Sequence, residues 1–320
     1  MPQGEFDLIR RYFAPGGIRH PETGLGIGDD CALLSCPPDM ELAVTVDTLV
    51  AGIHFFKDVS PESLGHKALA VNLSDLAAMG AQPKWCTLAL TLPEVTETWL
   101  EGFMRGFQAL AERHAVQLIG GDTTRGPLSI TVQAMGLAPR GQALRRSGAR
   151  PGDLIYVSHA IGAAGLALRQ RLSGQSIEDS GLVAALERPE PRLALGQQLR
   201  GLATACIDIS DGLAADLGHI LEASRVGARI HFERIPLLDS VRRHVEETGE
   251  ANLPLSSGDD YELCFTIPPK RRAETDAMLL ELGLGGCDIG VIADQPGLNI
   301  LCEGHELILE TFGHDHFPKA

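Results

Sequence analysis

Residues 207–217 read IDISDGLAADL, and the expected fold class follows from this stretch. An apolar run ends in aspartates and a glycine, and a helical pattern follows directly. The spacing of its apolar residues predicts a helix over 212–224 with one buried face. The members of that face are Leu213, Leu217, Ile220 and Leu221. A turn between a buried run and a buried helix is typical of mixed α/β proteins.

The start of this helix has two interpretations. Ser210 or Asp211 is expected to cap it, because short oxygen side chains accept hydrogen bonds from the first free N–H groups. The same N–H groups also form an anion site, so the alternative is a bound phosphate, with Asp208 reaching a metal. The residues alone leave both interpretations open.

Strand-like and helical stretches alternate on both sides of this segment. Strands are expected at 42–46, 85–92, 128–135, 154–157, 228–232, 261–267 and 288–293. Helices are expected at 61–79, 96–114, 161–172, 189–200, 212–224 and 270–282. A chain of 320 residues exceeds the usual size of one core, and Gly, Pro and Arg interrupt the pattern at 141–153. We therefore expect an α/β (α+β) protein with domains 1–148 and 149–320.

Aspartate occurs beside glycine or threonine in four more segments. These are GIGDDCA (26–32), VTVDT (44–48), GGDTTRG (120–126) and SSGDDYEL (256–263), and a further acid, Asp75, lies on the 61–79 helix beside a core stripe of Leu69, Leu73 and Leu76. Carboxylates suit hard cations, and glycine lets backbone approach a ligand closely. One such segment is equally well a turn or a cap, but the whole set predicts magnesium held near phosphates. GGDTTRG is expected to form a tight turn whose N–H groups bind an anion.

Composition excludes several classes of function. The net charge of −15 opposes nucleic-acid binding. No apolar run of about 18 residues and no signal-peptide pattern occur, so we expect a cytoplasmic protein without a membrane partner. The seven cysteines form no C-x-x-C pair and are interpreted as small buried residues. Neither a Walker loop nor G-x-G-x-x-G is present.

Basic residues and histidines give weaker signals. Arg145 and Arg146 open the 141–153 segment, where a guanidinium would clamp a phosphate or simply be solvated. His54 follows a predicted strand and has either a structural or a binding role. His314 and His316 are a weak metal pair.

Taken in chain order, eight segments resemble the thiamine-monophosphate kinases. They are GIGDDCA, VTVDTLVAGIHF, NLSDLAAMG, LIGGDTTRG, RRSGARPGD, IDISDGLAADL, SSGDDYELCFT and FGHDHF. Single segments are weak signals, but their order from about residue 25 to residue 317 is specific. The resemblance implies the two-domain fold of the aminoimidazole ribonucleotide synthetase-like proteins. It also implies a homodimer in which the N-terminal domains pair their sheets into a β-barrel.

The resemblance further implies roles for single residues. The implied magnesium ligands are Asp30, Thr45, Asp47, Asp75, Asp122 and Asp208, with Asp211 near a further ion. The implied ATP contacts are Gly121, Asp122, Arg146 and Ser210, and the implied contacts to thiamine monophosphate are His54, Phe317 and either Asp260 or Glu262. The chain departs from the family at Asp259, where Glu is commoner, and at His314, where an aromatic residue is commoner.

The function implied by the resemblance is the ATP-dependent phosphorylation of thiamine monophosphate to thiamine diphosphate, by direct in-line transfer with several magnesium ions. The acceptor phosphate has a second pKa of about 6 and is already a nucleophile at neutral pH, so no general base is expected. Two alternatives stay open. They are another ATP-using enzyme of the same superfamily and a non-catalytic, acidic metal- or nucleotide-binding protein.

Overall fold

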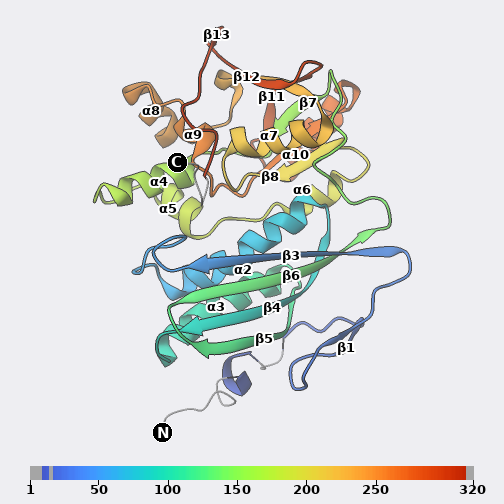
Figure 1. Cartoon of the computed structure of the whole chain (residues 1–320), viewed down its shortest axis with the longest axis vertical. Coiled ribbons are helices and arrows are strands. Elements are labelled where there is room, and N and C mark those ends of the chain that lie inside the picture. Colours follow the sequence, from blue (N-terminus) through green and yellow to red (C-terminus); the bar gives the residue numbers. More distant parts are fainter. Residues whose placement is uncertain (1–8, 14–16, 315–320) are drawn as a thin grey trace. The chain divides into compact units, whose positions relative to one another are not determined.

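The structure is a computed structural model that describes residues 9–13 and 17–314. It divides into two compact units, the first comprising Met1–Leu76 with Ala81–Gly141 and the second Ala77–Gly80 with Gln142–Ala320. Both units combine helices with sheets, which confirms the expected α/β class (Figure 1). The break after Gly141 lies at the start of the 141–153 segment, and the boundary at residue 148 stays a prediction.

The first unit is built on a sheet of four described strands, in the order β3-β6-β4-β5. Its strands are β3 (Met40–Val50), β4 (Gln82–Leu92), β5 (Gln117–Arg125) and β6 (Ser129–Pro139). Strand β6 pairs antiparallel with both β3 and β4, whereas β4 and β5 are parallel. Two helices, α2 (Pro61–Ala78) and α3 (Glu97–Arg113), lie along one face of this sheet (Figure 1). The predicted stripe of Leu69, Leu73 and Leu76 is buried on α2, as expected.

The opposite face of this sheet is only partly covered. The pair β1 (Thr23–Leu25) and β2 (Leu33–Leu34) carries Leu34, which packs on a cluster that contains Trp85 and Leu137. The Trp85 indole N–H donates to the Thr23 hydroxyl at 2.8 Å. Farther along the edge strand β3, Leu42, Val44 and Val46 stay 45%, 52% and 58% exposed. The first unit also contains the π-helical turn η1 (Ile9–Phe13).

The second unit contains a sheet of seven described strands, in the order β13-β12-β9-β11-β7-β10-β8. The strands are β7 (Leu154–Val157), β8 (Ala205–Asp208), β9 (Gly227–His231), β10 (Leu263–Ile267), β11 (Cys287–Ala293), β12 (Gly297–Cys302) and β13 (His305–Glu306). All neighbours pair antiparallel except β9 and β12. Because β8 and β10 are antiparallel, the end of β8 and the start of β10 meet at one edge of the sheet.

Helices and helical turns complete the second unit. The helices are α4 (Ala163–Leu172), α5 (Ser180–Glu187), α6 (Leu193–Gln198), α7 (Leu213–Ser224), α8 (Asp239–Thr248), α9 (Leu253–Ser256) and α10 (Arg272–Glu281), and the turns are η2 (Phe232–Arg234) and η3 (Pro269–Arg271). The predicted buried face of α7 is confirmed, since its four residues are 0–6% exposed. None of the described helices is long and apolar enough to cross a membrane.

Two expectations about single residue types and segments are wrong. Cys31 and Cys36 are exposed, although all cysteines were expected to be buried. The GGDTTRG segment is no tight turn, because residues 120–125 continue β5 alongside β4. The close approach of the two strands explains Gly121. A Cβ on Gly121, where φ is +157°, would lie 1.9 Å from the Leu88 carbonyl oxygen.

Candidate functional site

Strand β3 and helix α2 bring three of the predicted magnesium ligands together in the first unit. Thr45 and Asp47 are two residues apart and therefore share the face of β3 that α2 covers. The Thr45 hydroxyl donates a short hydrogen bond to the Asp75 carboxylate. Burial and, to a smaller extent, the negative charge of Asp75 together raise the pKa of Asp47 to about 6. We call Thr45, Asp47 and Asp75 the β3–α2 acid group.

The chemistry of this group fits a magnesium ion. Two carboxylates and a hydroxyl are hard oxygen donors, and the repulsion that raises the pKa of Asp47 would be relieved by a cation. Magnesium commonly uses one or two protein carboxylates and fills its remaining positions with water and phosphate oxygens. A complete protein cage is not formed, since no group of three or more His, Cys, Asp or Glu within residues 9–13 and 17–314 would hold a metal.

The structure does not bring the other predicted ligands of the first unit to this group. Asp122 lies on β5 and pairs with Ala89 of β4. Two strands, β6 and β4, separate β5 from β3. Because strand neighbours share a face and successive residues alternate, the register places Asp122 on the face opposite to Asp47. Asp30 lies exposed in the segment between β1 and β2. The roles of Asp30 and Asp122 stay predictions.

His54 lies in the turn that follows β3, as the sequence indicates. Its Nδ1 accepts a hydrogen bond from the Val50 N–H at 3.0 Å, and its own N–H donates to the Val50 carbonyl at 3.0 Å. An accepting Nδ1 places the proton of the neutral ring on Nε2. His54 therefore has a fixed tautomer and presents a donor, and its contact with a substrate stays a prediction.

In the second unit, Asp208 ends β8, and the loop of residues 208–212 leads into α7. The predicted cap by Ser210 or Asp211 is wrong. The Asp216 carboxylate, from the first turn of α7, accepts the N–H groups of Ser210, Asp211 and Gly212 at 3.0–3.1 Å. These N–H groups precede Leu213, the first residue of α7, so the alternative of a phosphate at the first N–H groups of the helix stays a prediction. The roles of Asp208, Ser210 and Asp211 through their side chains stay predictions.

Burial, together with the charge of Asp211, raises the pKa of Asp216 against the lowering effect of the three backbone N–H groups, and the resulting pKa is about 6. The sequence analysis missed Asp216. A signal was present, since aspartate in the first turn of a helix is a common partner for free N–H groups.

The turn of residues 258–261, within SSGDDYEL, docks on this loop through the backbone. The Asp259 N–H donates to the Ser210 carbonyl and the Tyr261 N–H to the Ile209 carbonyl, both at 2.8 Å. Asp259 and Tyr261 have φ values of +65° and +52°, and such conformations cost about 1–3 kcal/mol each. Gly258 is required here, because a Cβ would lie 2.4 Å from the Ser210 carbonyl oxygen. Strained backbone held by its surroundings is typical of functional sites.

Of the two alternative substrate contacts, Glu262 is buried and Asp260 is half-buried. Asp260 Oδ1 accepts the Gly162 N–H at 2.8 Å, and its Oδ2 has no hydrogen-bond partner among the described residues. Burial raises the pKa of Asp260 well above its usual range, and the charge of Glu262 adds to this effect. Glu262 is paired with Arg192 and Ser158. The geometry gives both acids a structural role, and their contact with a substrate stays a prediction.

The C-terminal segment and Arg146 are both anchored in the second unit. The His314 N–H donates to the Asp211 carbonyl at 3.0 Å, which brings the start of FGHDHF to the 208–212 loop. Phe317 lies outside the described residues. The Arg145 carbonyl accepts the Cys206 N–H at 2.8 Å, and the Arg146 carbonyl accepts the Ser224 hydroxyl at 3.2 Å. The segment around Arg146 is thus a fixed part of this unit, and its exposed side chain stays a predicted ATP contact.

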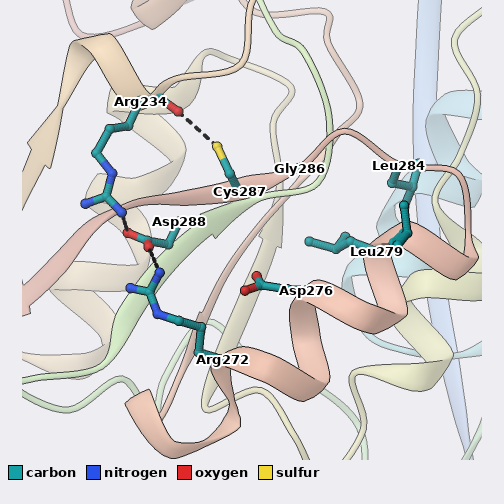
Figure 2. Close-up of a pocket in the computed structure, with 9 residues that line it drawn as sticks. Arg234, Arg272, Asp276, Leu279, Leu284, Gly286, Cys287 and Asp288 are labelled. Atoms are coloured by element: carbon teal, nitrogen blue, oxygen red, sulfur yellow. Dashed lines mark hydrogen bonds and ion pairs between the residues drawn. The ribbon is translucent and has the colours of Figure 1, made fainter.

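A cavity of about 550 Å³ lies at another place in the second unit, between α10, η2 and the start of β11 (Figure 2). Arg234 and Arg272 point at the buried Asp288 from two sides and both pair with its carboxylate. Asp276 accepts the Tyr156 hydroxyl at 2.7 Å. The charges that line this cavity therefore satisfy one another, and none of the predicted site residues is among them.

Comparisons with known proteins agree on one family. The models "AIR synthase related protein, N-terminal domain" and "AIR synthase related protein, C-terminal domain" match residues 28–138 and 150–303. Thiamine-monophosphate kinase of Escherichia coli (strain K12) is 51% identical over 322 residues, which cover 99% of this chain and 99% of that protein.

Solved structures are similar as well. Thiamine-monophosphate kinase from Stenotrophomonas maltophilia K279a has a TM-score of 0.84 and 46% identity, over 90% of this chain and 93% of that one. AaThiL complexed with AMPPCP and TMP has a TM-score of 0.77 and 30% identity, over 88% of this chain and 89% of that one.

Proposed function

Because the chain belongs to the thiamine-monophosphate kinase family and is a kinase, we propose that it transfers the γ-phosphoryl group of ATP directly and in line to the phosphate of thiamine monophosphate, with several magnesium ions. The observation that carries this proposal is the β3–α2 acid group. It offers oxygen donors whose mutual repulsion favours a bound cation.

Magnesium bound to these residues would neutralise negative charge on the phosphates of both substrates. The need is large, since two unit charges 4 Å apart at an effective dielectric of about 20 repel by about 4 kcal/mol. Asp47 and Asp75 would hold the ion, and Thr45 orients the Asp75 carboxylate through its hydroxyl. Asp208 and Asp211 are proposed as ligands of further ions in the second unit.

Both substrates are proposed from the relatives. AaThiL has been solved with AMPPCP and TMP, which supports ATP and thiamine monophosphate as ligands of this chain. We propose that Gly121, Asp122, Arg146 and Ser210 contact ATP, and that His54, Phe317 and the turn of residues 258–261 surround the acceptor. Asp260 belongs to that turn and Glu262 follows it directly, and one of the two is proposed as a further contact to thiamine monophosphate.

Direct transfer fits the residues of the chain better than a phosphorylated enzyme. His54 accepts a backbone N–H on Nδ1, so the proton on its Nε2 blocks nucleophilic attack by the neutral ring. The aspartates are proposed as metal ligands, and the acceptor phosphate is itself a nucleophile. We expect ATP made chiral at the γ-phosphorus to give inverted product. Retention, or label from ATP surviving on the denatured protein, would identify a covalent intermediate.

A homodimer is proposed from strand β3. Its outer edge has no neighbouring strand among the described residues, and it exposes Leu42, Val44 and Val46 in a row. An exposed apolar edge strand readily pairs with another sheet edge. Replacing Val44 and Val46 by Asp is expected to give a monomer in analytical ultracentrifugation. Leu280→Asp, at an apolar residue of α10 that is 80% exposed, is the control and should leave the dimer intact.

The activity is tested by incubating the protein with ATP, magnesium and thiamine monophosphate and separating the products by chromatography. We expect thiamine diphosphate and ADP in equal amounts. Unphosphorylated thiamine is the control acceptor, and it should react poorly because its alcohol lacks the charge and nucleophilicity of a phosphate. Equal kcat/KM for both acceptors would contradict the proposed substrate.

A further inference from the structure

Arg192 forms a partly buried ion pair with Glu262, the residue that directly follows the turn of residues 258–261. Its Nε donates to Glu262 Oε2 at 2.8 Å, and Nη2 donates to Oε1, so the guanidinium grips the carboxylate with two parallel hydrogen bonds. The Glu262 side chain is 6% exposed and that of Arg192 is 20% exposed. A buried two-pronged pair fixes direction as well as distance. The motifs of the sequence analysis did not include Arg192.

Glu262 is also joined to the neighbouring strands. The Ser158 hydroxyl donates to Glu262 Oε2, and Ser158 Oγ accepts the Leu263 N–H at 2.8 Å. On the other side, the Glu262 carbonyl accepts the Ile209 N–H at 2.8 Å. Glu262 therefore connects Arg192, the end of β7 and the loop that follows β8.

The turn of residues 258–261 directly precedes Glu262. Its backbone conformation is strained and depends on contacts with neighbouring segments. Three of its residues, Gly258, Asp259 and Tyr261, have positive φ. Its amides are bonded to the Ser210 and Ile209 carbonyls. A displaced Glu262 would pull on this strained segment at its C-terminal end.

We propose that Arg192 is a positioning residue for the acceptor site, because it holds Glu262 and thereby fixes the turn of residues 258–261 against the loop of residues 208–212. This inference rests on the proposed function for its effect on the acceptor. It predicts that arginine is required for its two-pronged geometry and not only for its charge, since lysine offers a single ammonium in place of the planar fork.

The first test measures the turn itself and needs no substrate. Amide hydrogen exchange of Asp259 and Tyr261 is compared between the parent protein and Arg192→Lys, and we expect exchange at least about tenfold faster in the variant. The control is Arg169→Lys, since Arg169 on α4 forms a two-pronged but more exposed pair with Glu250. Exchange in Arg192→Lys that equals that of the control would overturn the inference.

The second test measures kinetics with ATP and thiamine monophosphate. In Arg192→Lys we expect KM for thiamine monophosphate to rise about tenfold, with kcat and KM for ATP within about twofold of the parent. An equal loss in all parameters together with a lower melting temperature would show a merely structural pair. If the parent makes no thiamine diphosphate, the proposed function fails, and hydrogen exchange alone decides the role of Arg192.

A double variant separates geometry from buried charge. Arg192→Met combined with Glu262→Gln removes both charges and keeps similar volumes, so no unpaired charge is left in the interior. We expect it to fold and still to show the raised KM and the faster exchange. Parent values in this variant would mean that only the unpaired charge matters, and the positioning role would be abandoned.

Discussion

Each unit contains an aspartate whose pKa is raised to about 6, chiefly by burial: the half-buried Asp47 in the first and the buried Asp216 in the second. Their surroundings are opposite. Asp47 faces the like charge of Asp75, whereas Asp216 accepts three backbone N–H groups. The first carboxylate gains from a cation, and the second is already satisfied by the protein. A raised pKa therefore indicates a ligand site when a like-charge repulsion, such as that of Asp75 on Asp47, is not offset by backbone N–H groups, as the repulsion of Asp211 on Asp216 is.

The largest effect that tests this contrast is expected from Asp47→Asn. Turnover should fall by about 100-fold or more at limiting magnesium, because the variant removes a charged metal ligand. The free energy of unfolding without magnesium should stay equal or rise, since a repulsion with Asp75 is lost. Steady-state kinetics and urea unfolding measure the two quantities. Near-parent turnover would remove the β3–α2 acid group from the reaction.

Asp122→Asn extends the same experiment to the other face of the sheet. The family resemblance implies that Asp122→Asn loses as much turnover as Asp47→Asn. Asp75→Asn is expected to show the same loss of turnover. Kinetics at varied ATP and magnesium would show the loss. Parent-like values for Asp122→Asn alone would mean that the chemistry uses only the face of β3 that carries Asp47.

Asp216→Ala should chiefly affect stability. Three N–H groups would lose their acceptor, and we expect a loss of about 1–3 kcal/mol in the free energy of unfolding, with or without magnesium. Asp179→Ala is the control, because Asp179 caps α5 through the Gly181 N–H. Its loss should be about 1 kcal/mol or less. A loss in Asp216→Ala that vanishes with magnesium would make Asp216 a ligand residue.

The pH dependence of stability is expected to separate Asp47 from its Asn variant. The folded pKa of about 6 exceeds the unfolded value of about 3.9, so the folded state binds the proton more tightly. The contribution of Asp47 to stability is thus present at low pH and is lost as pH rises through about 6. Urea unfolding in EDTA should show Asp47→Asn gaining on the parent between pH 5 and pH 7.5. A constant gap would contradict the raised pKa.

Thr45→Val should give the smallest effect. Without its hydroxyl the Asp75 carboxylate loses one hydrogen bond, and we expect about two- to tenfold more magnesium at half-maximal turnover. Thr45→Ser keeps the hydroxyl and should behave like the parent in the same magnesium titration. An equal change in both variants would point to packing of the methyl group instead of the hydrogen bond to Asp75.

The sequence predicts those features that local patterns encode. The buried face of α7 and the strand that carries Thr45 and Asp47 follow from periodicity. Capping residues usually precede a helix, whereas Asp216 lies inside the first turn of α7 and binds backward to the N–H groups of residues 210–212. The pairing of Arg192 with Glu262 joins residues 70 positions apart, and nothing local indicates it. The turn expected at GGDTTRG is wrong because Gly121 is needed for the close approach of β4 and not for a bend in the chain.

The alternation along β3 has a genetic consequence. Its odd-numbered residues Thr45 and Asp47 face α2, and the even-numbered Val44 and Val46 lie exposed on the other side. Because successive residues of a strand point to opposite faces, a one-residue slip exchanges the two sets. A single codon inserted in frame within the first residues of this strand would therefore turn the carboxylate outward and the valines inward. The proposed magnesium site and the exposed apolar surface of β3 would both be lost in one mutation. We therefore expect β3 to tolerate substitutions far better than changes of length.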